Sequence, residues 1–191
     1  LTARERAAAL FDDGRYVEIG ALAANLSEDG DRPSPADGLI AAFGKIDGQP
    51  ALTLIEDFTV QAGSIGDAGG SKRQRVTALA LQERVPLVMM LEGAGHRLTN
   101  SHAQPAPNDL QALARLSGQV PVVTLVLGAA AGHSALAAPM ADFAVMTKAA
   151  SLFVAGPPIV KAAIGEDVTK EQLGGPEVHL ASGVIHNLAE D

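Results

Sequence analysis

The first third of the chain has a mixed apolar and polar pattern. Thr2-Ala-Arg-Glu5 has the form of a capping box, in which a threonine and a glutamate satisfy backbone N–H groups at a helix start, and it predicts a helix through about Leu10. A short apolar run at 16–19 predicts a strand. Two longer apolar runs, 39–46 and 50–56, are separated by an Asp-Gly pair and predict a β-hairpin.

Polar and glycine-rich segments connect these elements. Residues 27–37 are polar and contain two prolines, which favours an exposed loop. Residues 62–70 contain four glycines and predict a flexible loop. A helix is then predicted from about Ser71 to Glu83, because Val76, Leu79 and Ala80 share one helical face.

From residue 86 onward the pattern alternates between strands and helices. The strands are almost continuous apolar runs, which is typical of a parallel sheet covered on both faces, so we expect βαβ units and a single α/β domain over residues 1–191. The predicted elements are, in order, a strand at 86–91, a helix at 108–116, a strand at 120–127, a helix at 134–138 and a strand at 142–146. A last strand at 151–155 leads through Gly156-Pro-Pro158 into a short helix.

Composition and charge narrow the function classes. The formal net charge of -8 argues against a general nucleic-acid or acidic-membrane surface. The chain contains no cysteine, which excludes disulfides and thiolate metal sites and fits an intracellular protein. No apolar run reaches the roughly 18 residues needed to span a bilayer. With aromatic residues at 3%, aliphatic side chains must form most of the core.

Two similar corners follow two of the apolar strands. Leu87 to Leu91 runs into Glu-Gly-Ala-Gly-His96, and Val122 to Leu127 runs into Gly-Ala-Ala-Ala-Gly-His133. The carboxyl ends of neighbouring parallel strands lie at one edge of a sheet, where ligands usually bind, so both corners should face one cleft. Small residues leave backbone N–H groups uncovered, and two such groups can hold a negative oxygen. The corners therefore predict an oxyanion hole, although small residues also suit close packing.

The sequence resembles the carboxyltransferase β subunits of biotin-dependent acyl-CoA carboxylases, of the acetyl-, propionyl- and methylcrotonyl-CoA carboxylase type. The resemblance covers essentially the whole chain. It is carried by an ordered series of short matches: Thr2-Ala-Arg-Glu-Arg6, Phe11-Asp-Asp-Gly14, Val17-Glu-Ile-Gly20, Ile46-Asp-Gly48, Glu56-Asp-Phe-Thr-Val60, Gly63-Ser64, Phe153-Val154, Gly156-Pro157, Gly165-Glu-Asp-Val-Thr169, Leu173-Gly-Gly175, His179, Ser182-Gly-Val184 and His186.

This resemblance implies a crotonase-like fold, with its ββα superhelix, and the amino-terminal, acyl-CoA-binding half of a two-domain subunit. It implies transfer of a carboxyl group from biotin, which is carried on a separate protein or domain, to the α-carbon of an acyl-CoA. It also implies a biotin carboxylase partner, a homo-oligomer and a cytoplasmic location, with no nucleic acid, membrane or metal involved.

The same resemblance assigns residues to the site. Ala94, Gly95 and Gly132 match positions credited with the oxyanion hole. The chain departs from the family where it has Gly-His96 and Gly-His133, and these two imidazoles are expected to narrow the pocket, add a donor or act as a base. The expected CoA-binding residues are Gly63, Ser64, Lys72, Arg75, Gly93, Gly156 and Pro157, whereas Arg73 fits a solvated helix face equally well.

Other interpretations stay open on the residues alone. Gly132-His-Ser134 partly matches a nucleophile elbow, with Asp167 and His179 as its partners. A crotonase-type hydratase or decarboxylase would use a corner carboxylate such as Glu92. Weaker possibilities are a dinucleotide site that begins at Gly93, a metal site that includes His102, and a catalytically silent assembly subunit.

Overall fold

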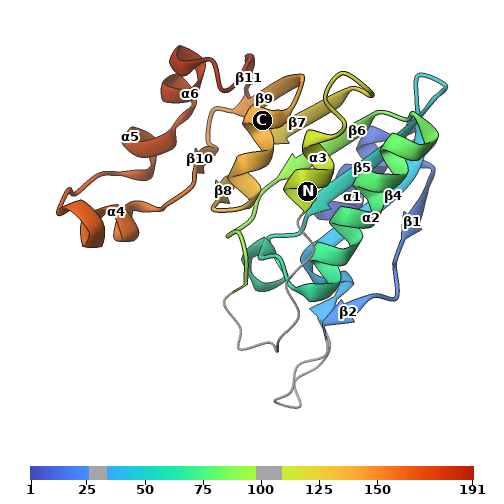
Figure 1. Cartoon of the computed structure of the whole chain (residues 1–191), viewed down its shortest axis with the longest axis horizontal. Coiled ribbons are helices and arrows are strands. Elements are labelled where there is room, and N and C mark those ends of the chain that lie inside the picture. The colour runs from blue at the N-terminus through green and yellow to red at the C-terminus, as the bar shows by residue number, and fades with distance from the viewer. Residues whose placement is uncertain (26–33, 98–108) are drawn as a thin grey trace.

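A computed structural model describes residues 1–25, 34–97 and 109–191 of the chain (Figure 1). Its main sheet has seven strands in the order β1-β4-β5-β6-β7-β9-β11. These strands are β1 (Tyr16–Ile19), β4 (Leu39–Ile46), β5 (Gln49–Glu56), β6 (Leu87–Leu91), β7 (Val122–Val126), β9 (Phe143–Thr147) and β11 (Asn187–Ala189). A parallel pair, β8 (Ala129–Ala131) and β10 (Ser151–Phe153), forms a separate small sheet.

The hairpin and the parallel strands are confirmed. β4 pairs antiparallel with β5, from Leu39 opposite Glu56 to Ile46 opposite Gln49. From β5 onward every neighbouring pair in the sheet is parallel. The carboxyl ends of β5, β6 and β7 therefore lie side by side, and the corners that follow β6 and β7 leave the same edge of the sheet.

The first two helices cover opposite faces of the sheet. Ile40 and Ile55 pack with the apolar side of α1 (Ala3–Leu10). Their neighbours Ala41 and Leu54 pack with α2 (Asp67–Glu83). Successive strand residues point to opposite faces, so the two helices sandwich the hairpin. The capping box predicted at Thr2 is present, with both of its hydrogen bonds.

The long helix begins four residues earlier than predicted. Its first turn contains Gly69, whose N–H donates to the Asp37 carboxylate at 2.8 Å. A side chain at Gly69 would come within 3.1 Å of the Asp37 carbonyl oxygen, so glycine permits this close approach. The prediction of an exposed loop at 27–37 is wrong in its described part, because Ala36 and Asp37 are buried; residues 26–33 lie outside the described ranges.

The remaining helices are short. α3 (Asp109–Ala114) follows β6, and the helix after β7 is the 3₁₀ helix η4 (Ser134–Met140), which contains Pro139. Proline has no N–H to donate, which disfavours a regular α-helix there. The other short elements are η1 (Asp12–Gly14), β2 (Ala24–Asn25), β3 (Ser34–Pro35), η2 (Ala36–Gly38) and η3 (Gln61–Gly63).

A C-terminal arm, residues 154–183, extends from the body of the molecule (Figure 1). It contains the expected short helix α4 (Pro157–Ile164) and two helices that the pattern did not predict, α5 (Lys170–Gly174) and α6 (Pro176–Ser182). α4 buries no residue, and Ile159 and Ile164 are 60% and 65% exposed. Within the described ranges, no helix is long and apolar enough to cross a membrane.

Replacement of Gly44 by alanine should destabilise the fold. A Cβ at Gly44 would lie 2.5 Å from the Phe11 ring and 3.0 Å from the Arg15 carbonyl oxygen, so the change over-packs the β4 surface and should cost about 1–3 kcal/mol of unfolding free energy. Urea denaturation measures this value. The control is Gly70→Ala in α2, where the new Cβ makes ordinary contact and should add about 0.5–1 kcal/mol. Equal effects of the two changes would contradict the assigned packing.

Candidate functional site

The two corners are in direct backbone contact. We call residues 92–97 the first corner and residues 127–133 the second corner. A Cβ built on Gly95 would lie 2.9 Å from the carbonyl oxygen of Ala131 and 3.2 Å from the amide nitrogen of His133. The N–H of Ala131 also donates to the carbonyl of Gly93 at 2.8 Å. The two corners therefore meet at one edge of the sheet; that they face a common cleft stays a prediction.

The hydrogen bonds of the corner amides revise the assignment of the oxyanion hole. The N–H of Ala94 donates to the Ala62 carbonyl at 3.0 Å, and the N–H of Gly132 donates to the Phe153 carbonyl at 3.0 Å. The assignment of the Ala94 and Gly132 N–H groups as donors to a ligand oxygen is therefore wrong. The N–H groups of Gly95 and His133 donate to no other residue in the described ranges. Both amides are therefore candidates to bind a ligand.

Glycine is required where the corners touch. Gly95 and Gly132 have φ of +81° and +59°, in the left-handed region that favours glycine. A side chain at Gly95 would meet backbone atoms of the second corner rather than open space. A substitution at Gly95 would therefore disturb the fold as well as the site.

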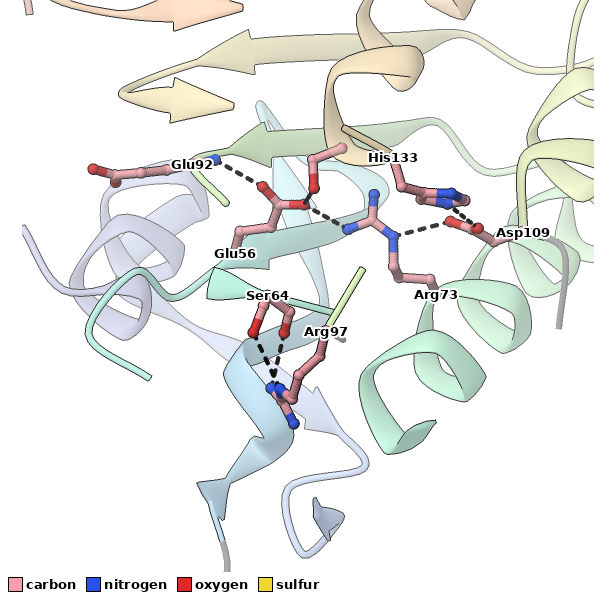
Figure 2. A network of polar contacts seen from close by, with 8 residues as sticks. Glu56, Ser64, Arg73, Glu92, Arg97, Asp109 and His133 are labelled. Carbon is pink, nitrogen blue, oxygen red and sulfur yellow. Dashed lines mark hydrogen bonds and ion pairs between the residues drawn. The ribbon is translucent and has the colours of Figure 1, made fainter. Parts of the chain in front are cut away.

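One buried carboxylate holds both corners. Glu56, at the end of β5, is 1% exposed. Its Oε2 accepts the N–H of Glu92 in the first corner at 2.8 Å, and its Oε1 accepts the hydroxyl of Ser134, directly after the second corner, at 2.6 Å (Figure 2). Because Ser134 is fully buried and hydrogen-bonded to Glu56, the nucleophile-elbow alternative is wrong.

A charged chain extends from Glu56 to His133 (Figure 2). Arg73 of α2 donates from Nη1 to Glu56 Oε1 at 2.8 Å and from Nε to Asp109 Oδ2 at 2.9 Å. Asp109 Oδ1 lies 2.5 Å from Nε2 of His133. Burial disfavours charge on Arg73, but Glu56 and Asp109 outweigh it and raise the pKa of the guanidinium. The solvated-face interpretation of Arg73 is therefore wrong.

The ionisation of Asp109 fixes the orientation of the His133 ring. Burial alone would raise the pKa of Asp109, but the hydrogen bond from His133 and the charge of Arg73 lower it to about 2. A carboxylate only accepts hydrogen bonds, so Nε2 of His133 carries a proton, and in the neutral form of the ring the lone pair is then on Nδ1. The ring of His96 packs edge-on against that of His133, with centroids 4.4 Å apart. Burial, and then the His133 ring, lower the pKa of His96.

Charged side chains of the first corner face away from the His133 ring. The Glu92 carboxylate pairs with Arg6 of α1 at 2.5 Å, and Figure 2 shows it directed away from Glu56 and His133. Glu92 is therefore not placed as the acid or base of a hydratase. At the other end of the corner, Arg97 pairs with the buried Asp37 at 2.6 Å. These two ion pairs fix the corner at both ends.

Two of the residues expected to bind CoA phosphates have different environments. Lys72 is buried, and its Nζ donates to the carbonyl oxygens of Ala36, at 2.5 Å, and Leu39. Because its Nζ is occupied by these carbonyl oxygens inside the protein, Lys72 braces η2 and the start of β4 and is wrong as a phosphate ligand. Burial also lowers the pKa of Lys72 to about 8. Arg75 is exposed on α2. Residues two apart do not share a helical face, which separates Arg75 from the buried Arg73.

The other expected CoA-binding residues lie around the corners. Gly63 and Gly93 are packed together, because a Cβ on Gly93 would lie 2.6 Å from the Gly63 carbonyl oxygen. The Ser64 hydroxyl donates to the Gln61 carbonyl at 2.8 Å and accepts from Arg97 at 3.1 Å (Figure 2). These residues support the first corner. Gly156 and Pro157 begin α4, just beyond the strand that binds Gly132.

The remaining alternatives are not assembled in the described residues. Asp167 pairs with Lys161 at 2.8 Å, and Nε2 of His179 lies 2.6 Å from the Leu152 carbonyl oxygen, so neither joins Ser134 in a triad. No group of three or more candidate ligands for a metal ion is found in the parts of the chain that are described. His102 lies outside those parts.

Sequence reasoning missed Glu56, Arg73 and Asp109 as residues of the site. Arg73 precedes Val76 by three positions and Ala80 by seven, so it occupies the buried face of α2. This spacing was the sequence signal that could have identified Arg73 as buried. Glu56 ends an otherwise apolar strand, and its burial depends on partners that are 17 and 78 positions away. Such partners are set by tertiary structure alone.

Comparisons with known proteins place this geometry among carboxyl transferases. The family model described as the carboxyl transferase domain matches residues 1–191. The β5 subunit of the biotin-dependent acetyl-/propionyl-coenzyme A carboxylase of Mycobacterium leprae is 37% identical over 199 residues, covering 98% of this chain and 36% of the relative. The methylmalonyl-CoA carboxyltransferase 12S subunit of Propionibacterium freudenreichii is 35% identical over 196 residues, covering 100% of this chain and 37% of the relative.

A solved structure agrees with the fold. The transcarboxylase 12S crystal structure, a hexamer with methylmalonyl-coenzyme A bound, superimposes with a TM-score of 0.89 at 34% identity, covering 100% of this chain and 38% of that one. The crotonase-like α/β fold expected from the sequence is confirmed. The chain spans little more than a third of the length of these relatives.

Replacement of Glu56 by alanine should sharply lower stability. The change leaves Arg73 with one carboxylate partner instead of two and frees the Glu92 N–H, and breaking a buried ion pair costs about 3–5 kcal/mol. Urea denaturation gives the loss. The control Glu190→Ala removes an exposed pair with Lys148 and should leave the free energy of unfolding almost unchanged. Similar losses for the two variants would contradict the role of Glu56.

Proposed function

Because the chain belongs to the carboxyl transferase domain family, we propose that it is the carboxyltransferase component of an acyl-CoA carboxylase, in which it binds the acyl-CoA and stabilises its enolate. The observation that carries this proposal is the contact between the two corners, which places Gly95 beside the amide of His133, and neither N–H donates to another residue in the described ranges. The negative charge of a thioester enolate develops on its oxygen, and backbone donors at that point stabilise it without any nucleophile.

The surrounding residues serve this hole by holding it rigid. Glu56 binds each corner, and the ion pairs of Glu92 with Arg6 and of Arg97 with Asp37 fix the first corner. Donors that are already oriented need no reorganisation when charge develops. A single donor of this kind is worth a factor of about 10²–10³ in rate.

The proposal includes a biotin group that is carried on a separate protein or domain. Biotin supplies the carboxyl group that is transferred, and no residue of this chain is assigned to it. The partners of the chain would be acyl-CoA, a biotin carboxylase with its carrier, and further copies of the chain in a homo-oligomer. The exposed apolar residues Ile159 and Ile164 of the C-terminal arm support such contacts. A cytoplasmic location fits the lack of cysteine.

Titration with acetyl-CoA or propionyl-CoA should show saturable binding, and the chain together with its partner subunits should carboxylate the acyl-CoA when carboxybiotin is supplied. Calorimetry measures binding, and incorporation of labelled bicarbonate measures transfer. The uncarboxylated carrier provides the background rate. A folded chain that binds no CoA thioester would contradict the proposal and favour a silent assembly subunit.

Arg75→Gln should weaken acyl-CoA binding, because an exposed arginine suits the phosphates of CoA. We expect KM to rise several-fold while kcat stays within about twofold, since a contact to the CoA is made equally in the ground state and the transition state. The matched control is Arg84→Asn, which removes the same charge at the other end of α2, from a left-handed residue that asparagine tolerates. If both variants raise KM equally, the effect is long-range charge and the assignment of Arg75 is wrong.

A further inference from the structure

His133 contributes an anchored imidazole to the site in addition to its backbone N–H. Its Nε2 lies 2.5 Å from Asp109 Oδ1, and Asp109 is held in turn by Arg73 Nε at 2.9 Å. The side chain of His133 is 12% exposed, so the ring is largely packed but still reaches the surface. A carboxylate that orients one nitrogen of an imidazole leaves the other nitrogen to exchange protons.

We propose that His133 is the base that removes the α-proton of the bound acyl-CoA. This inference rests on the proposed function, because it needs an acyl-CoA at the corners. The α-carbon–hydrogen bond breaks, the proton passes to Nδ1 of His133, and the electron pair moves onto the thioester oxygen, where the amides of Gly95 and His133 hold the charge. The reverse step returns the proton, so no further reactant is consumed.

The charges around His133 favour this transfer. Among the described residues, the groups that face its ring are Asp109 from α3, with Arg73 from α2 behind it, and His96 from the first corner. Together with Glu56, these residues form a buried cluster of two carboxylates, Glu56 and Asp109, and one guanidinium, Arg73. The carboxylates therefore outnumber the guanidinium by one, and a proton gained by His133 brings the net charge of the cluster to zero. The neighbouring His96 has a lowered pKa and stays neutral, which avoids two adjacent cationic rings.

The two histidines allow the roles of two neighbouring rings to be compared within one site. They are the same residue type with rings 4.4 Å apart, but Asp109 anchors only His133 among the described residues. Deuterium exchange into the methyl group of acetyl-CoA in D₂O, with no biotin present, reports α-proton removal alone. The full chain should catalyse this exchange, and His133→Gln should reduce it by about 100-fold, as expected for loss of a general base. His96→Gln should reduce the exchange by less than His133→Gln does, because no carboxylate among the described residues anchors the His96 ring.

A second variant separates the positioning role of Asp109 from a structural one. Asp109→Asn should slow the exchange and lower the pH at which it reaches half of its maximum, because the protonated ring loses its carboxylate partner. A slower exchange with an unmoved pH profile would contradict that role. Calorimetric binding of acetyl-CoA shows whether each variant is folded. If Asp109→Asn does not fold, the exchange rate of His133→Gln alone decides whether His133 is the base.

The outcomes separate this inference from the proposed function. Carboxylation without biotin-independent exchange would overturn the role of His133 and leave the carboxyltransferase assignment intact. Exchange that survives in His133→Gln but is lost in His96→Gln would also overturn it. Failure of the parent chain to bind acetyl-CoA at all would instead remove the proposed function.

Discussion

The hydrogen bonds of the Glu56 carboxylate are the interaction on which the site depends. Its two oxygens accept from the first corner, from Ser134 after the second corner and from Arg73. A buried carboxylate is costly to desolvate, and it is tolerated because these donors compensate its charge. Once Glu56 is satisfied in this way, the two loops that follow β6 and β7 have little freedom to separate, and their amides are held where a substrate oxygen can meet them.

The local backbone explains why small residues recur at the corners. Gly95 and Gly132 adopt positive φ, and the atoms of the opposite corner occupy the space where a side chain at Gly95 would lie. Ala94 and Gly132 use their N–H groups to fasten the corners to neighbouring strands and loops. The next residues along the chain, Gly95 and His133, have N–H groups that donate to no residue in the described ranges. Each corner therefore contains both amides that hold it in place and an amide that we assign to the ligand.

Elements with strong local signals could be predicted from the sequence. The capping box at Thr2, the Asp-Gly hairpin and the apolar strands at β6 and β7 all depend on residues close together in the chain, and all are confirmed. The start of α2 was misjudged because glycines normally weaken a helix, whereas Gly69 here makes room for Asp37. The helices α5 and α6 are too short to show a clear period.

The sequence predicted where the candidate site lies and that it would bind an oxyanion, but not which residues hold it together. The pattern of the two corners was enough to bring Gly95 and His133 together, because parallel strands align their carboxyl ends. It gave no means of knowing which amides were already bonded, or that Lys72 would be buried while Arg75 stayed exposed. Those outcomes depend on partners from η2, η3 and β10, which meet these residues only in the folded chain.

A crystal structure of the chain with a non-hydrolysable acyl-CoA analogue would test the central claim most directly. The account requires the oxygen that mimics the enolate to lie about 3 Å from the amide nitrogens of both Gly95 and His133, while Glu56 keeps its bonds to the two corners. An analogue oxygen bound elsewhere, or bound to only one of these amides with the corners moved apart, would contradict it.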